Sequence, residues 1–137
     1  MGKPQQRVIE VSTDGVGLFK ISQEVAQFLR ESAVGLGLVN LFIQHTSASL
    51  VITENADPRV HSDLLEYFDR IAPQSSIYRH DDEGPDDMPA HLKTVLTQTS
   101  LTIPFNKQGL MLGTWQGLYV CEHRVAAHRR RVVLTIV

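Results

Sequence analysis

Residues 38–54 read LVNLFIQHTSASLVITE, and this stretch decides the class of fold. It contains two apolar runs of strand length, at 38–44 and 49–53, separated by a short polar segment. The first run has apolar residues at both odd and even positions, which predicts a central strand that is covered on both faces. A sheet is therefore expected at the centre of the fold.

The flanking elements complete the predicted architecture. Strands are expected at 7–11, 18–21, 100–104, 110–112, 117–123 and 131–137, and the first two are predicted to form a hairpin around the turn at 14–17. With helices at 23–32, at 58–71 and from residue 87 or 88, the order is ββαββααββββ. This order predicts an α+β domain in which a large mixed or antiparallel sheet is packed by about three helices. No linker or repeat divides residues 1–137, so a single domain is expected.

The second helix has a clear start and a clear apolar pattern. Asp57 has the residue type of an N-cap and is followed by proline, which is favoured at the first helical position. Four apolar residues at helical spacing are predicted to face inward: Val60, Leu64, Phe68 and Ile71.

Composition indicates an ordinary globular protein. Hydrophobic residues make up 42% of the 137 residues, which is enough for a buried core. The single cysteine, Cys121, cannot form an internal disulfide, and this fits the expected cytoplasmic location. The first residues, MGKPQQRVIEV, lack the apolar region of a signal peptide, and no stretch is long enough to cross a bilayer. A formal net charge of -2 indicates neither nucleic acid nor an anionic membrane as a partner.

The polar segment after the central strand holds the first candidate site residues. His45 shares a strand face with Leu41 and Ile43, and a histidine in that position is more often a core or rim residue than a functional one. The hydroxyl groups of Thr46 and Ser47 would bind an anion or orient a ligand. The structural alternative is that they hydrogen-bond the backbone of a turn.

Three further residues add metal-ligand chemistry. Glu122 lies on a strand face with apolar neighbours, so it is either paired, bound to a metal, or placed where the strand emerges into solvent. His80 lies in an acidic loop, and His91 lies in the first turn of the next helix, where the helix N-terminus disfavours the imidazolium. Together with His45 they form a sensible set of nitrogen and oxygen ligands, although their spacing matches no recognised local motif.

Two charge runs and one aromatic residue complete the candidates. Residues 81–87 read DDEGPDD and residues 123–131 read HRVAAHRRR. These runs are either two solvated surfaces or a cation-attracting loop that faces an anion-binding segment. Within the acidic loop, Asp81, Asp86 and Asp87 would attract Mg²⁺, which prefers oxygen ligands. Trp115, between the glycines of GTWQG, is either a hydrophobic plug or a stacking wall for an aromatic heterocycle.

Five strings of this sequence, taken in order, resemble the YjbQ-type family, whose members are described as secondary thiamine-phosphate synthases. The strings are QHTSASL at 44–50, ENADPRV at 54–60, YRHDDEGPDDMPAHLK at 78–93, TSLTIP at 99–104 and GTWQGLYVCEHR at 113–124. The resemblance covers nearly the whole chain from about residue 40. One departure is Cys121, where a smaller residue such as glycine is expected in close relatives, and this affects local packing more than chemistry.

The resemblance implies a small α+β domain that assembles as a homotrimer, with sites near subunit boundaries. It also implies a weak or secondary activity in which a hydroxymethylpyrimidine diphosphate alkylates a thiazole phosphate and releases pyrophosphate. The positions that match the family's motifs are His45, Thr46, His80, His91, Gln116 and Glu122. The expected catalytic residues are His45, Thr46, Gln116 and Glu122, and the expected metal ligands are His45, His80, His91 and Glu122.

This reaction sets the expected roles of the remaining residues. A divalent metal would neutralise the diphosphate; the histidines favour zinc, and phosphate chemistry favours magnesium. Substrate contacts are expected from Ser47, Trp115, Arg124, Arg129 and Arg130, with the arginines on phosphate oxygens and the indole beside the pyrimidine. Glu122 would bind either the metal or the aminopyrimidine. Two other classes of function fit the same residues: a metal-dependent hydrolase, and a non-enzymatic metal- or anion-binding trimer.

Overall fold

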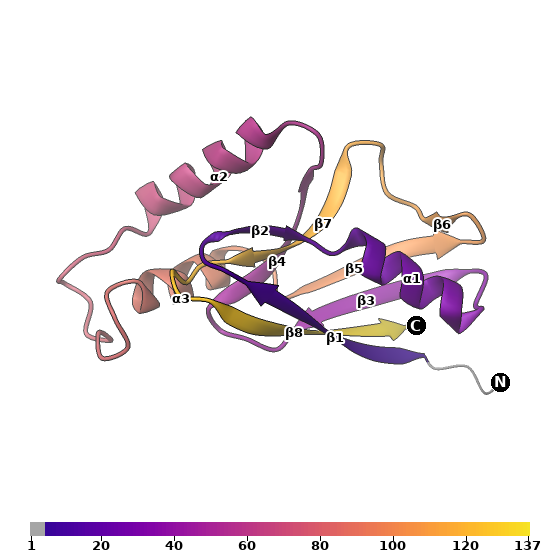
Figure 1. The fold of residues 1–137 in the computed structure, drawn as a ribbon, viewed down its shortest axis with the longest axis horizontal. Coiled ribbons are helices and arrows are strands. Elements are labelled where there is room, and N and C mark those ends of the chain that lie inside the picture. The colour runs from indigo at the N-terminus through magenta and orange to yellow at the C-terminus, as the bar shows by residue number, and fades with distance from the viewer. Residues whose placement is uncertain (1–4) are drawn as a thin grey trace.

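The computed structural model describes residues 5–137 and shows two antiparallel sheets with three helices (Figure 1). The elements are β1 (Gln6–Thr13), β2 (Gly17–Lys20), α1 (Ser22–Ser32), β3 (Gly37–Ile43), β4 (Ala48–Glu54), α2 (Pro58–Ile71), α3 (Asp87–Leu96), β5 (Ser100–Asn106), β6 (Gly109–Leu110), β7 (Gln116–Glu122) and β8 (His128–Ile136). One sheet has the order β1-β8-β3-β5-β6 and the other the order β2-β7-β4. The predicted α+β class and order of elements are confirmed, and the strands are divided between two sheets.

The core lies between the inner faces of the two sheets and α1. Period-two alternation turns apolar side chains of β3, β7 and β8 inward, and α1 adds an apolar stripe. Leu41 of β3, Val120 of β7, Leu134 of β8 and Phe28 of α1 are completely buried. The prediction of a central strand at 38–44 is confirmed, because β3 lies inside its sheet between β5 and β8. The expected cover on both faces is wrong, because Leu38 and Phe42 on the outer face are 43% and 46% exposed.

Three connections pass from one sheet to the other at the same end of the molecule. They are residues 14–16, 44–47 and 123–127, and we call this the crossing end. The strand registers place these connections together: Thr13 is opposite His128 in one sheet, and Glu122 is opposite both Gly17 and Ala48 in the other. Where a strand leaves its sheet the backbone loses ladder partners, so polar side chains are needed there.

The hairpin predicted around residues 14–17 is wrong. β1 pairs with β8, and β2 pairs with β7 in the other sheet. Gly15, with φ of +137°, allows the chain to turn away from the first sheet, and a Cβ on it would lie 3.1 Å from the carbonyl oxygen of Val125. A glycine turn between two strand-like runs therefore marks a change of sheet here.

α2 and α3 start at the predicted residues, but the apolar face of α2 is buried less than predicted. Asp57 caps α2 by accepting a hydrogen bond from the Arg59 amide at 2.9 Å. The apolar stripe of α2 is expected to be buried, yet none of its residues is fully buried and Ile71 is 43% exposed. On α3, Val95 and Leu96 are 81% and 62% exposed. These faces have no cover within the described part of this chain.

No helix in the described range 5–137 is long and apolar enough to cross a membrane.

His123 is buried on the outer face of the smaller sheet, against α2. Its ring is 2% exposed and packs edge-on against Phe68, with the centroids 6.0 Å apart. Its Nε2 and the Ser49 hydroxyl oxygen are 2.9 Å apart. Burial, reinforced by the charge of Lys93, lowers the pKa of His123 to about 4.

This burial predicts a loss of stability in mild acid. Between pH 6.5 and about 4 the imidazole binds a proton in the unfolded chain but not in the folded one. The free energy of unfolding should therefore fall by about 3 kcal/mol as the pH is lowered through this window. Urea denaturation at several pH values measures the effect, and His123→Gln should remove most of this slope. An unchanged pH dependence in the variant would contradict the assignment.

Candidate functional site

His80, Asp87 and His91 form a compact cluster at the crossing end. Asp87 is 4% exposed, and its Oδ2 lies 2.6 Å from His80 Nε2. Its Oδ1 lies 3.6 Å from His91 Nε2. One ligand atom from each residue can be chosen so that all three atoms lie within 4.8 Å of one another. Of the four predicted metal ligands, the structure brings together His80 and His91.

The backbone of α3 and a neighbouring connection orient this cluster. Asp87 and His91 are four residues apart on α3, so their side chains share one face of the helix. The Nδ1 atom of His91 lies 2.8 Å from the carbonyl oxygen of Thr46, in the connection between β3 and β4. This contact leaves Nε2 directed at Asp87. An imidazole whose second nitrogen is held by a carbonyl is a common arrangement of a metal ligand.

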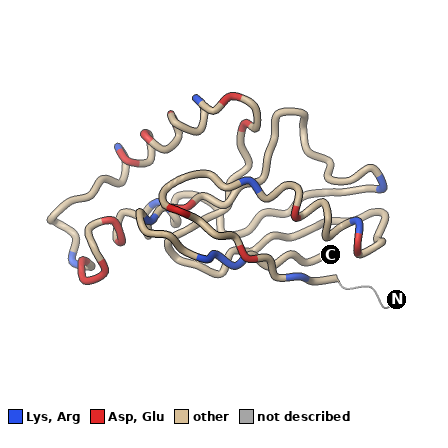
Figure 2. The backbone as a smooth tube through the Cα atoms, in the orientation of Figure 1, with Lys and Arg blue, Asp and Glu red and all other residues tan. Residues whose placement is uncertain are grey.

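Arg124 holds the acidic residues of this cluster. Its Nη1 donates to Asp87 at 2.8 Å, its Nε donates to Asp86 at 3.0 Å, and its Nη2 donates to the carbonyl of Glu83. The two charge runs therefore do meet, as an ion-pair network between the loop before α3 and the connection after β7. The acidic loop is the red segment at the lower left of Figure 2. Three of the five N–H donors of Arg124 are bound to oxygen atoms of this chain, so its main contacts are within the protein, and its expected role in phosphate binding stays a prediction.

Glu122 and Arg130 form a buried ion pair where the core reaches the crossing end. Both side chains continue inward-facing rows of their strands, and they are 0% and 3% exposed. Arg130 donates to both carboxylate oxygens through Nε and Nη2. Thr13 and the Arg124 amide donate two more hydrogen bonds to the same carboxylate, at 2.6 and 3.1 Å.

This network explains the charge of Glu122. Burial alone would raise the pKa of Glu122, but the hydrogen bonds from Arg130, Thr13 and Arg124 outweigh burial and lower it. Glu122 lies outside the His80–Asp87–His91 cluster, so within one chain it does not join the other predicted metal ligands. Arg130 likewise binds Glu122 and the hydroxyl oxygen of Ser47, and it is not free for phosphate.

His45 belongs to this second network. Its Nε2 accepts a hydrogen bond from the Arg131 amide at 2.8 Å, and its Nδ1 lies 3.4 Å from Arg130 Nη1. Burial, followed by the charge of Arg130, lowers the pKa of His45, which favours the neutral ring. His45 lies outside the His80–Asp87–His91 cluster. The next residue along the chain, Thr46, contacts His91 of that cluster through its carbonyl oxygen.

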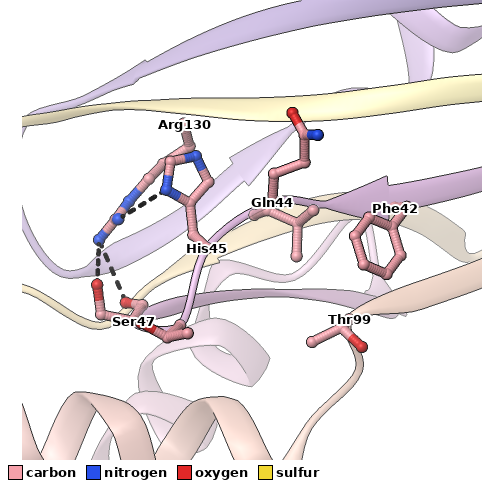
Figure 3. Close-up of a pocket in the computed structure, with 8 residues that line it drawn as sticks. Phe42, Gln44, His45, Ser47, Thr99 and Arg130 are labelled. Atoms are coloured by element: carbon pink, nitrogen blue, oxygen red, sulfur yellow. Dashed lines mark hydrogen bonds between the residues drawn. The ribbon is translucent and has the colours of Figure 1, made fainter.

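An open pocket of about 530 Å³ lies beside the cluster. It is lined by residues from the end of β3, the following connection and two further segments: Phe42, Ile43, Gln44, His45, Thr46, Ser47, Thr99 and Arg130. Figure 3 shows His45, Ser47 and Arg130 together on one side, with Phe42 and Thr99 on the other. Thr46 lines the pocket and its backbone carbonyl contacts His91, so the pocket is next to the cluster, although His80, Asp87 and His91 do not line it.

Three predicted site residues lie away from this site. Trp115 is 62% exposed, and the adjacent Gln116 begins β7, with its side-chain oxygen accepting a hydrogen bond from the Gly113 amide at 2.7 Å. Gln116 and Glu122 are six positions apart at the two ends of β7, which is about 20 Å along an extended strand. Arg129 is exposed and faces away from the core on β8. Within one chain these three side chains do not join the cluster or line the pocket.

The cluster offers the donor set of a divalent metal site. Two imidazole nitrogens and one carboxylate oxygen lie close together, and the contacts of Arg124 and Thr46 hold two of the three side chains. Such a set would suit zinc and neighbouring first-row metals.

The sequence does not predict the roles of two residues in these networks, Asp87 and Thr13. It predicts Asp87 as a possible magnesium ligand in the acidic loop, but does not group it with the histidines. Its four-residue spacing from His91 is the signal that links them, because it places both on one helical face. Thr13, which donates to Glu122, carries no signal in the sequence, because a threonine at the end of a strand has many ordinary roles.

The fold and the site define a class of small two-sheet α+β domains with a His–Asp–His cluster where the chain crosses between sheets. Residues 7–137 match the family model described as UPF0047 protein YjbQ-like. This chain belongs to that family. UPF0047 protein sll1880 of Synechocystis sp. is 42% identical over 135 residues, covering 98% of this chain and 92% of the relative. UPF0047 protein YjbQ of Escherichia coli O157:H7 is 39% identical over 132 residues, covering 96% of both.

Solved structures confirm the fold. The conserved hypothetical protein TT1486 of Thermus thermophilus matches with a TM-score of 0.86 and 33% identity, covering 96% of this chain and 99% of that one. The hypothetical protein APE1520 of Aeropyrum pernix K1 matches with a TM-score of 0.88 over 98% of both chains; at 24% identity it supports the fold alone.

Proposed function

We propose that this protein is a metal-dependent transferase of the thiamine-phosphate synthase type, acting on a small phosphorylated substrate as a weak or secondary activity. The observation that carries the proposal is the cluster of His80, Asp87 and His91 beside an open pocket. The reaction class comes from the family resemblance, and a divalent metal bound at the cluster would supply positive charge for a departing pyrophosphate.

The cofactor in this proposal is a divalent metal held by the two imidazoles and Asp87. When bound, such a metal supplies positive charge that stabilises phosphate oxygens. The nitrogen-rich donor set favours zinc or a neighbouring first-row metal, because Mg²⁺ prefers oxygen ligands. Asp87 orients both imidazoles, and Arg124 holds Asp87 in place.

The chain's own residues position the substrate in the pocket. The neutral ring of His45 faces the pocket and is oriented by the Arg131 amide. Thr46 lines the pocket and its backbone carbonyl contacts His91, so in this proposal its hydroxyl group contacts a phosphate oxygen. The Glu122–Arg130 pair holds Ser47, and it thereby fixes the connection that carries His45 and Thr46.

We also propose that the protein assembles as a homotrimer with its sites near chain boundaries. The exposed apolar side chains of Val95, Leu96 and Trp115 support association, since such surfaces often mark interfaces. Gln116 lies at the far end of β7, so only a neighbouring chain would bring a copy of it to the site. Sedimentation should give three times the chain mass of 15.3 kDa, and a monomer would contradict the assembly.

Product analysis tests the proposed reaction. Zn²⁺-loaded protein incubated with the pyrimidine diphosphate and the thiazole phosphate should form thiamine phosphate and pyrophosphate, and Asp87→Asn should lose this activity by more than about tenfold. Hydrolysed diphosphate without the coupled product would indicate a metal-dependent hydrolase instead. Ligand-induced stabilisation without any product would indicate a non-enzymatic binding protein.

A further inference from the structure

Phe42 is an aromatic side chain that the fold leaves uncovered at the pocket. It lies on the outer face of β3, opposite Val133 of β8 and Ser100 of β5, and it is 46% exposed. At this point β5 begins, and the Ile43 amide donates to the carbonyl of Thr99. Phe42 therefore stands at the corner where the pocket opens.

The pocket has two chemically different sides. His45, Ser47 and Arg130 form a hydrogen-bonded group on one side, and the Phe42 ring lies on the other (Figure 3). The metal-ligand cluster adjoins the polar segment, through the contact between Thr46 and His91. A ligand that fills the pocket would thus meet polar groups at one end and an aromatic ring at the other.

We propose that Phe42 is the specificity-determining wall for a flat, aromatic end of the substrate. The inference rests on the proposed function, which places the anionic end of the substrate at the His80–Asp87–His91 cluster. The substrate class is then an aromatic or heteroaromatic ring joined by a short link to a phosphate. Aromatic faces pack well against one another, and small-molecule sites commonly pair such a wall with a few polar groups.

This assignment replaces Trp115 as the stacking residue. Trp115 lies beside Gln116, at the end of β7 that is remote from the crossing end, and it does not line this pocket. Phe42 is separated from His45 by only two residues of the same segment, so its position relative to the polar side is set by local backbone structure.

The test compares two phosphate monoesters that differ in the ring. In Zn²⁺-loaded protein, calorimetry should show phenyl phosphate binding about tenfold more tightly than methyl phosphate. Phe42→Ala should abolish this preference, and Phe42→Tyr should retain it. The matched control is Leu38→Ala, since Leu38 is on the same face of the same strand and is 43% exposed, but lies outside the pocket.

The outcomes separate this inference from the proposed function. Equal binding of the two esters to the unmodified protein, or a preference that survives Phe42→Ala, would overturn the role of Phe42 and leave the anion site standing. Loss of the preference in Leu38→Ala as well would overturn it too, because the effect would then be general to the sheet face. Failure to bind either ester would overturn both.

Discussion

Replacing His91 by alanine is expected to lower the affinity of the protein for Zn²⁺ by more than about 100-fold. Loss of residues that merely orient metal ligands typically reduces affinity by about 10- to 100-fold, so loss of a ligand should exceed this range. His91 contributes Nε2 to a set of three donor atoms, and apart from His80 and His91 no histidine belongs to a three-ligand group within residues 5–137. Competition of the protein with a chromophoric zinc chelator measures the change.

His61 supplies the matched control for this experiment. Its Nε2 lies 2.6 Å from the backbone carbonyl of Glu54, much as His91 Nδ1 lies beside that of Thr46, but His61 is on α2 and outside the cluster. His61→Ala should therefore leave the Zn²⁺ affinity unchanged. Equal affinities in the two alanine variants would show that the cluster does not bind the metal.

Replacing Glu122 by alanine is expected to reduce the free energy of unfolding by about 3 to 5 kcal/mol. The change leaves the guanidinium of Arg130 buried, at 3% exposure, without its carboxylate partner. An unpaired buried charge is far more costly than the absence of the whole pair. The same change removes the acceptor of the Thr13 hydroxyl at the end of β1 and of the Arg124 amide in the connection at 123–127. Urea denaturation followed by circular dichroism gives the difference.

A double variant separates the unpaired charge from a general loss of packing. In Glu122→Leu with Arg130→Met, an apolar pair replaces the ion pair, and most of the lost stability should return. Glu10→Ala is the surface control, because Glu10 is exposed and opposite Arg131 in the sheet register, and it should change stability little. A loss below about 1 kcal/mol in Glu122→Ala would contradict the described network.

The extent to which the fold could be predicted depended on whether each signal was local. Strand and helix positions followed from short patterns, such as the apolar run at 38–44 and the Asp57 cap. The division into two sheets could not be predicted, because it depends on pairing between segments more than 100 residues apart, such as Gln6 with Thr135. A helical apolar stripe shows which face is apolar, but the cover of that face is a property of tertiary or quaternary packing, as Ile71 and Val95 show.

The candidate site follows the same rule: the sequence predicts individual candidate residues, but not the distant residues that pair with them. The sequence marked His80 and His91 as ligand candidates, and their convergence is confirmed by position. Glu122 was recognised as a costly inward carboxylate, but its partner Arg130 could not be identified, since the two residues lie on different sheets. The phosphate-binding arginines were predicted from charge alone, and charge does not reveal that Arg124 already binds Asp86 and Asp87.

Zinc-edge anomalous diffraction from crystals grown with Zn²⁺ tests the central claim most directly. The account predicts one strong peak about 2.0 to 2.2 Å from His80 Nε2, His91 Nε2 and an Asp87 carboxylate oxygen, with Glu122 still paired to Arg130. A crystal with no peak at this position, or with zinc bound only elsewhere, would contradict it.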